Sequence, residues 1–252
     1  MSEIDKLIEM IKDSKKIVFF GGAGVSTESG LKDFRSSDGL YNEKYKYPPE
    51  EVLSHSFFIN HTGAFYDFYR DKLNPNNYKP NVTHYVLSKM EHNNMLSSVI
   101  TQNIDGFHQD AGSSNVLELH GSVKRNYCMK CHRFYSDDVI FNSTGIPKCD
   151  CGGIIKPDVV LYEEGLNESV IKKTINEIST CDLLIIGGTS LNVYPAASFI
   201  NYFRGKYLVL INKSITQYDH ICNLVIHDSI GKVFESIEKS LFWTEPQKLD
   251  SL

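Results

Sequence analysis

The alternation of short apolar runs with stretches of helical periodicity constrains the fold of this chain most strongly. Apolar runs of strand length lie at Ile17–Phe20, Ser98–Ile100, Leu183–Ile186, Leu208–Ile211 and Leu224–Ile226. Helical patterns lie at residues 4–11, 168–179 and 231–241. Continuous apolar runs are typical of parallel strands buried on both faces. The sequence therefore predicts an α/β fold with a Rossmann-like, doubly wound parallel sheet.

Two regions interrupt this alternation, at residues 36–90 and 122–154. The first is rich in aromatic residues and has helix and loop patterns, and the second holds four of the six cysteines. We expect both to be insertions that form a smaller module against the sheet domain. The Rossmann-like domain is then assigned to residues 1–35, 91–121 and 155–243, with a loose tail at 244–252.

The composition narrows the class of protein. Of the 252 residues, 41% are hydrophobic and 23% are charged, close to the globular average. A net charge of −5 gives no general attraction to nucleic acid or anionic lipid. No apolar run approaches the roughly 20 residues that span a bilayer, and residues 1–16 match no secretory or transit signal. We expect a cytoplasmic monomer that binds neither nucleic acid nor membrane.

Glycine-rich loops follow two of the expected strands, at Gly21–Ser26 and Gly187–Ser190. Small residues in such loops let backbone amides approach a pyrophosphate. The first loop has Thr27 in place of the third glycine of the dinucleotide fingerprint, and no acidic residue closes a second strand about 20 residues later. This disfavours an ordinary hydride-transferring dehydrogenase. A plain strand-to-helix turn remains an alternative interpretation of each loop.

Polar residues also stand at the expected carboxyl edge of the sheet. The segment Thr101–Gly106 supplies two amides and a carboxylate directly after the second strand, and Asn212 follows the fourth. Doubly wound sheets bind their ligands at this edge, although such residues are also ordinary turn formers. His120 can serve as a general base because imidazole titrates near neutrality, but a lone histidine beside glycine is more often structural.

Four cysteines in two close pairs predict a metal site. Cys128-x-x-Cys131 and Cys149-x-Cys151 offer four thiolates, which suit a tetrahedral structural zinc. A pair of cytosolic disulfides is the poorer alternative. The second pair is one residue shorter than the usual Cys-x-x-Cys, and His132 is the obvious substitute ligand nearby. We expect one structural zinc ion per chain, held by the zinc-binding insertion at 122–154.

The order of these motifs resembles that of the sirtuin family, in a compact bacterial-type form. The matching motifs are Gly22–Gly30, Asp33-Phe34-Arg35, Thr101–Gly106, Leu119-His120-Gly121 and Gly188-Thr189-Ser190. They keep a family-like spacing through most of the chain, and the cysteine module falls where the family has one. The resemblance implies an NAD-dependent protein-lysine deacylase. Such an enzyme transfers the acyl group of an acylated-lysine protein to ADP-ribose and releases nicotinamide.

The resemblance also implies roles for individual residues. His120 would be the base that deprotonates a ribose hydroxyl, with Asn103 as a second catalytic residue. The implied contacts to the co-substrate NAD are Gly22, Ala23, Gly24, Thr27, Asp33, Phe34, Arg35, Gln102, Asn103, Asp105, His120, Gly188, Thr189, Ser190 and Asn212. Backbone pairing with the substrate would involve Val160, Leu161 and Tyr162.

Two further features concern the substrate. Glu163 replaces the glycine that the family usually has before Glu164, which we expect to alter the preference around the target lysine. Sirtuins that prefer succinyl or malonyl groups carry Tyr-x-x-Arg in the helical insertion. Aligned on Tyr66, the arginine position holds Tyr69, and Arg70 lies one residue further. One residue turns a helix position by about 100°, so we expect acetyl or neutral acyl groups to be preferred over succinyl.

Two other functions remain open at this point. A mono-ADP-ribosyltransferase would move ADP-ribose to a protein nucleophile, and the base assigned to His120 argues against it. A zinc-bearing sensor of NAD or ADP-ribose would bind without turnover, and the full set of polar residues argues against that.

Overall fold

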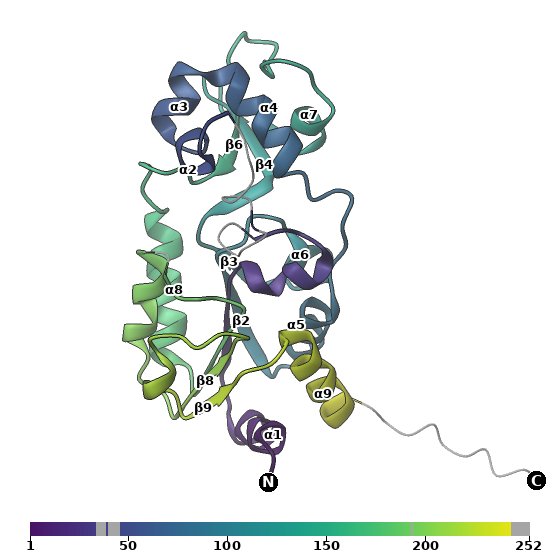
Figure 1. Cartoon of the computed structure of the whole chain (residues 1–252), viewed down its shortest axis with the longest axis vertical. Coiled ribbons are helices and arrows are strands. Elements are labelled where there is room, and N and C mark those ends of the chain that lie inside the picture. Colours follow the sequence, from purple (N-terminus) through teal and green to yellow (C-terminus); the bar gives the residue numbers. More distant parts are fainter. Residues whose placement is uncertain (34–38, 40–45, 193, 243–252) are drawn as a thin grey trace, which may run out of the picture.

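A six-stranded parallel sheet is the larger of the two sheets in the computed structural model, which describes residues 1–33, 39, 46–192 and 194–242 (Figure 1). Its strand order is β3-β2-β1-β7-β8-β9. The strands are β1 (Ile17–Gly21), β2 (Leu96–Thr101), β3 (Val116–Glu118), β7 (Leu183–Gly187), β8 (Tyr207–Ile211) and β9 (Leu224–Ile226). The order reverses between β1 and β7, which makes this the topological switch point of a doubly wound sheet. The predicted fold class is confirmed.

Helices cover both faces of this sheet. One face carries α1 (Glu3–Asp13), α5 (Val82–His92) and α9 (Ile230–Phe242), and the other carries α8 (Glu168–Thr180) and the 3₁₀ helix η4 (Ala196–Tyr202) (Figure 1). Successive side chains of a strand point to opposite faces. Phe19 therefore packs in the first core, whereas Val18 and Phe20 pack in the second. Within the described ranges, no helix has the length and apolarity needed to cross a bilayer.

A smaller module contains a three-stranded antiparallel sheet with the order β5-β4-β6. Its elements are α2 (Pro49–Val52), α3 (His55–Asn60), α4 (Thr62–Lys72), β4 (Gly121–Cys128), β5 (Phe134–Ser136), α7 (Asp138–Phe141) and β6 (Ile155–Val159). Buried aromatic side chains of α3 and α4 form much of its core. The Tyr66 hydroxyl donates to the carbonyl of Ile155 at 2.5 Å. This bond joins the helical insertion to β6.

Two elements lie across the boundaries expected from the sequence. α5 belongs to the range assigned to the small module, but its Val86, Leu87 and Met90 pack in the core of the large sheet. β6 belongs to a range assigned to the large domain, but it pairs with β4. The reason is physical: each element buries its apolar face where a partner face is available, whatever its position in the chain. The division into domains as a whole stays a prediction.

Two buried histidines meet between α5 and the short helix α6 (Phe107–Asp110). The ring centroids of His84 and His108 lie 4.7 Å apart. The His84 Nδ1 accepts the backbone N–H of Asn81 at 3.1 Å. Burial lowers the pKa of His84 to about 4. Burial and the proximity of His84 hold the pKa of His108 well below its usual value, so both rings are neutral in the folded protein near pH 7.

This pair makes stability sensitive to acid. The unfolded chain protonates these rings near pH 6.5, whereas folded His84 takes up a proton only near pH 4. The contribution of neutral His84 to the free energy of unfolding is therefore complete above about pH 6.5. It is lost as the pH falls toward 4. We expect His84→Gln to flatten the dependence of melting temperature on pH between 7 and 5, with the exposed His220→Gln as control. Equal slopes in His84→Gln and wild type would contradict this account.

Candidate functional site

The two glycine loops lie against each other at the switch point. Backbone amides of Gly22 and Gly24 donate to the carbonyls of Gly187 and Gly188, at 3.3 and 2.8 Å. A Cβ on Gly24 would lie 2.8 Å from the Cα of Gly188, too close for any side chain. Glycine is therefore required at this contact between the loops. The close approach leaves a small-residue surface at the carboxyl edge of the sheet, which is the property that a phosphate-binding loop needs.

A hydrogen-bonded cluster joins the first loop to the segment after β2. The carboxylate of Asp105 accepts from the Ser26 hydroxyl at 2.8 Å and from the Phe107 backbone N–H at 2.9 Å. The Asn103 side-chain amide donates to the same Ser26 hydroxyl at 3.0 Å. Burial raises the pKa of Asp105, and its hydrogen bonds oppose that shift. Ser26 thus orients both Asn103 and Asp105.

Ser26 was not among the site residues predicted from the sequence. Its position inside the matching stretch Gly22–Gly30 was the available signal. Its role follows from contacts to residues nearly eighty positions away in the chain, at Asn103 and Asp105. Sequence spacing cannot reveal such contacts.

His120 is held in one orientation by the backbone. Its Nδ1 lies 2.9 Å from the carbonyl oxygen of Gln102. A carbonyl can only accept a hydrogen bond, so Nδ1 carries the hydrogen and the neutral ring has its lone pair on Nε2. The Gln102 side-chain amide donates to the Thr189 hydroxyl at 3.2 Å. Gln102, after β2, therefore links His120, after β3, to Thr189, after β7.

The turn after His120 also depends on glycine. Gly121 has a φ of +74°, and a Cβ there would lie 1.9 Å from the carbonyl oxygen of Asp158. The close approach brings the start of β4 against the end of β6. The carbonyl of His120 accepts the N–H of Val160 at 3.0 Å. The backbone of His120 is thus fixed to the segment predicted to pair with substrate.

That segment continues toward α3. The N–H of Tyr162 donates to the carbonyl of Leu53, and the carbonyl of Tyr162 accepts the N–H of His55, both at 2.9 Å. Leu161 is buried in the small core, whereas the side chain of Tyr162 is exposed. Val160, Leu161 and Tyr162 therefore bridge His120 and the helical insertion.

The remaining predicted residues are distributed around the same edge. Ala23 and Thr27 lie in the 3₁₀ turns η1 (Ala23–Val25) and η2 (Thr27–Ser29), with the Thr27 hydroxyl donating to the Gly24 carbonyl at 3.0 Å. Asp33 ends the first described stretch, and Phe34 and Arg35 lie outside the described residues.

Ser190 and Asn212 lie where β7 and β8 end, at the carboxyl edge of the large sheet. Ser190 is exposed after β7. The Asn212 N–H donates to the Ile226 carbonyl at 3.1 Å, and its side-chain amide donates to Ser214 at 2.8 Å. The structure thus brings together the two glycine loops, Gln102–Asp105 and His120, and places Asn212 one strand further along the sheet.

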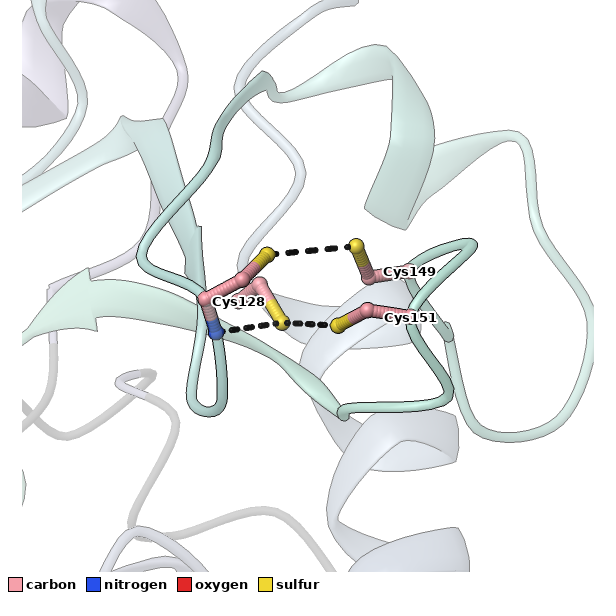
Figure 2. Close-up of side chains that lie close together, drawn as sticks. Cys128, Cys149 and Cys151 are labelled. Carbon is pink, nitrogen blue, oxygen red and sulfur yellow. Dashed lines mark hydrogen bonds between the residues drawn. The ribbon is translucent and has the colours of Figure 1, made fainter.

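The four cysteines of the small module form a compact cluster (Figure 2). Their sulfur atoms all lie within 4.8 Å of one another. The Sγ–Sγ distances are 3.4 Å for Cys128 and Cys151 and 3.6 Å for Cys131 and Cys149. Zinc–sulfur bonds of about 2.3 Å in a tetrahedron place the sulfurs about 3.8 Å apart, whereas a disulfide needs about 2.05 Å. The cluster fits one structural zinc ion bound by four thiolates.

The shortened second pair is accommodated by its own loop. The N–H of Gly152 donates to the carbonyl of Cys149, and the N–H of Cys149 donates to the carbonyl of Gly153, both at 2.8 Å. This tight turn directs both thiols of the pair toward Cys128 and Cys131. Within the described part of the chain, His132 is outside the cluster of possible ligands.

The fold and site together define a class: a doubly wound α/β protein with a glycine-loop site at its switch point and a four-cysteine module. The family model described as Sir2 family matches residues 22–195. The chain belongs to the Sir2 family. The predicted family membership is thereby confirmed.

Similar proteins cover nearly the whole chain. The NAD-dependent protein deacetylase of Clostridium perfringens is 60% identical over 239 residues, covering 93% of this chain and 98% of that protein. The protein of the same name from Clostridium acetobutylicum is 57% identical over 241 residues, covering 94% and 98%. A solved structure of Sir2 with a p53 peptide and NAD+ has a TM-score of 0.84 and 35% identity, covering 95% of this chain and 98% of that one.

The cysteine cluster predicts a measurable metal content. We expect one zinc ion per chain by elemental analysis of protein purified without chelator. Cys149→Ser removes one of four thiolates, so it should lower zinc content and reduce the melting temperature by roughly 5 °C or more. Cys222→Ser is the matched control, because Cys222 lies outside the cluster and its thiol donates to the Tyr218 carbonyl. Absence of zinc from the wild type would refute the assignment.

Proposed function

We propose that this chain is an NAD-dependent protein-lysine deacetylase that transfers the acyl group of lysine to ADP-ribose with release of nicotinamide. The observation that carries the proposal is the orientation of His120 by the Gln102 carbonyl at the carboxyl edge of the sheet. The activity named for relatives at 60% and 57% identity supports it. A solved structure of Sir2 bound to an acetylated peptide, with a TM-score of 0.84, supports a peptide substrate.

In this proposal NAD supplies the ribose that accepts the acyl group, and the chain supplies binding groups and a base. The lone pair of His120 Nε2 takes a proton from a ribose hydroxyl. Asn103 acts as a second catalytic residue, with its amide fixed by Ser26. Because these dipoles are already held by the fold, they can stabilise a positively charged ribose centre without reorganising.

The other predicted contacts divide between cofactor and substrate. The glycine loops, with Gly22, Gly24 and Gly188, bind the phosphates of NAD. Asn212 and Ser190 contact its adenosine part. Val160–Tyr162 pairs with the backbone of the acylated protein. We also retain the predictions that the chain acts as a monomer, in the cytoplasm, and without nucleic acid or membrane.

The direct test is mass spectrometry of an acetyl-lysine peptide incubated with the protein and NAD. We expect loss of acetyl with matching amounts of nicotinamide and O-acetyl-ADP-ribose. General-base catalysis typically contributes about 10²–10⁴-fold, so His120→Ala should lower the rate by at least about 100-fold. His220→Ala is the control, because His220 is exposed and precedes β9, an edge strand that β8 separates from the strands of the glycine loops, β1 and β7.

The same reaction separates the alternatives. An unchanged peptide together with ADP-ribosylated protein would identify a transferase. Binding of NAD without nicotinamide release, for every acyl group tried, would identify a sensor.

The contacts of Arg70 support a preference for acetyl or neutral acyl groups over succinyl. Its guanidinium donates to the Gly145 carbonyl at 2.9 Å and to the Asp67 carboxylate at 3.0 Å. Tyr69 is fully buried and stacks on Phe141. Both side chains are therefore engaged inside the small module, and the Tyr-x-x-Arg pair that would bind an acyl carboxylate is not reproduced.

We expect the wild type to act on an acetyl-lysine peptide at least about tenfold faster than on the matching succinyl peptide, since an unpaired carboxylate is costly to bury. Arg70→Gln should leave the ratio of the two rates unchanged, because Arg70 takes no part in acyl binding. A succinyl rate above the acetyl rate, or a ratio that depends on Arg70, would refute this preference.

A further inference from the structure

Glu163 occupies a backbone conformation that favours glycine. Its φ is +76°, and the N–H of Glu164 donates to the carbonyl of Leu161 at 3.0 Å. This is a four-residue turn with its third residue in the left-handed region, where glycine is the usual choice because it has no Cβ. A glutamate here is strained relative to glycine. Its side chain, unlike the hydrogen of a glycine, can contact other residues.

Both carboxylate oxygens of Glu163 contact a single residue of the helical insertion. One accepts the backbone N–H of Ser56 at 2.8 Å, and the other accepts the Ser56 hydroxyl at 2.9 Å. Ser56 lies in the first turn of α3, where backbone N–H groups lack partners within the helix. The Glu163 carboxylate supplies a partner for this N–H, and its negative charge suits the start of the helix.

The neighbouring Glu164 secures the other side of the turn. Its carboxylate accepts the N–H of Leu161 at 3.0 Å and contacts Lys156 Nζ at 3.2 Å and His55 Nδ1 at 2.9 Å. Burial favours a higher pKa for Glu164, but the hydrogen bonds from His55 and Leu161 and the charge of Lys156 lower that pKa below its usual value. The turn is thus held internally by Glu164 and to α3 by Glu163.

This arrangement fixes the segment immediately before it. The backbone of Tyr162 already bonds to Leu53 and His55 at the start of α3, and Val160 bonds to His120. The contact between Glu163 and Ser56 adds a side-chain link at the same junction. Two acceptor sites of this carboxylate are thus taken up by its own chain, which fixes the side chain at this junction.

We propose that Glu163 is a positioning residue that holds the substrate-pairing backbone at Val160–Tyr162 through its two bonds to Ser56. The inference rests on the proposed deacetylase function. A positioning role should appear in peptide affinity and leave NAD binding unchanged. The alternative is that Glu163 selects the charge of residues flanking the target lysine, which would alter the preference around that lysine.

The test compares Glu163→Ala, Glu163→Gly and Glu163→Gln in steady-state deacetylation of an acetyl-lysine peptide. Exposed polar contacts are individually weak, so we expect Ala and Gly to raise the peptide KM by about two- to fivefold, with kcat and the KM for NAD unchanged. Gln can still accept the Ser56 N–H and donate to its hydroxyl, so its KM should stay within about twofold of wild type. A wild-type KM for both Ala and Gly would overturn the proposal.

Two comparisons separate this role from simple loss of a charge or of folding. Glu168→Ala removes a nearby exposed glutamate whose carboxylate pairs with Lys172, and it should have no effect. Ser56→Ala combined with Glu163→Ala should raise KM no further than Glu163→Ala alone, because both changes break the same contact. Additive effects would overturn the proposal.

Peptides with lysine or glutamate beside the acetyl-lysine test the charge-reading alternative. The ratio of their KM values should be the same for wild type and Glu163→Gln, and a changed ratio would favour charge reading and overturn the proposal. Peptide binding without turnover is measured in parallel by fluorescence anisotropy. A weaker Kd in Glu163→Ala supports the inference even if the wild type fails to deacetylate, which would refute only the proposed function. No peptide binding by the wild type would overturn both.

Discussion

The pairing of β1 with β7 is the constraint on which the rest of the structure depends. The two strands run parallel in direct register, from Ile17 opposite Leu183 to Gly21 opposite Gly187. Both are completely buried, so a shift by one residue would send each apolar side chain to the wrong face. The register therefore places the two glycine loops side by side. The contact between Gly24 and Gly188 is possible only because neither residue has a side chain.

The site is assembled from segments that this register aligns. Gln102 continues from β2 and its N–H donates to the Gly21 carbonyl at 3.0 Å, while its own carbonyl orients His120. The N–H of Leu119 donates to the Thr101 carbonyl at 2.9 Å. Backbone groups of the sheet edge thus hold the polar side chains. The geometry of the proposed base is consequently a property of the sheet and not of a mobile loop.

The small module is held together by a core and a cysteine cluster of its own. Its aromatic core packs α3 and α4 against β4 and β6, and the four-cysteine cluster ties the end of β4 to the loop before β6. A module of this size has a limited core, so a bound metal ion is an effective way to stabilise it. The segment Val160–Tyr162 passes from His120 to α3. The position of a peptide bound there would depend on both parts of the molecule.

The sequence by itself predicted five of the six strands of the large sheet and the four-cysteine site, but it predicted neither β3 nor the three strands of the small sheet. The apolar runs gave the buried strands, the glycine loops and polar clusters marked the carboxyl edge, and the spacing of Cys128, Cys131, Cys149 and Cys151 indicated zinc. These signals are local, because each apolar run, glycine loop or cysteine pair is recognised from a few neighbouring residues. The structure decided what depends on contacts distant in the chain. It assigned α5 to the large sheet and β6 to the small one, gave Ser26 its partners Asn103 and Asp105, and directed Glu163 to Ser56. A pattern of residue types does not encode which side chains meet across such separations, since that depends on how complete elements pack together.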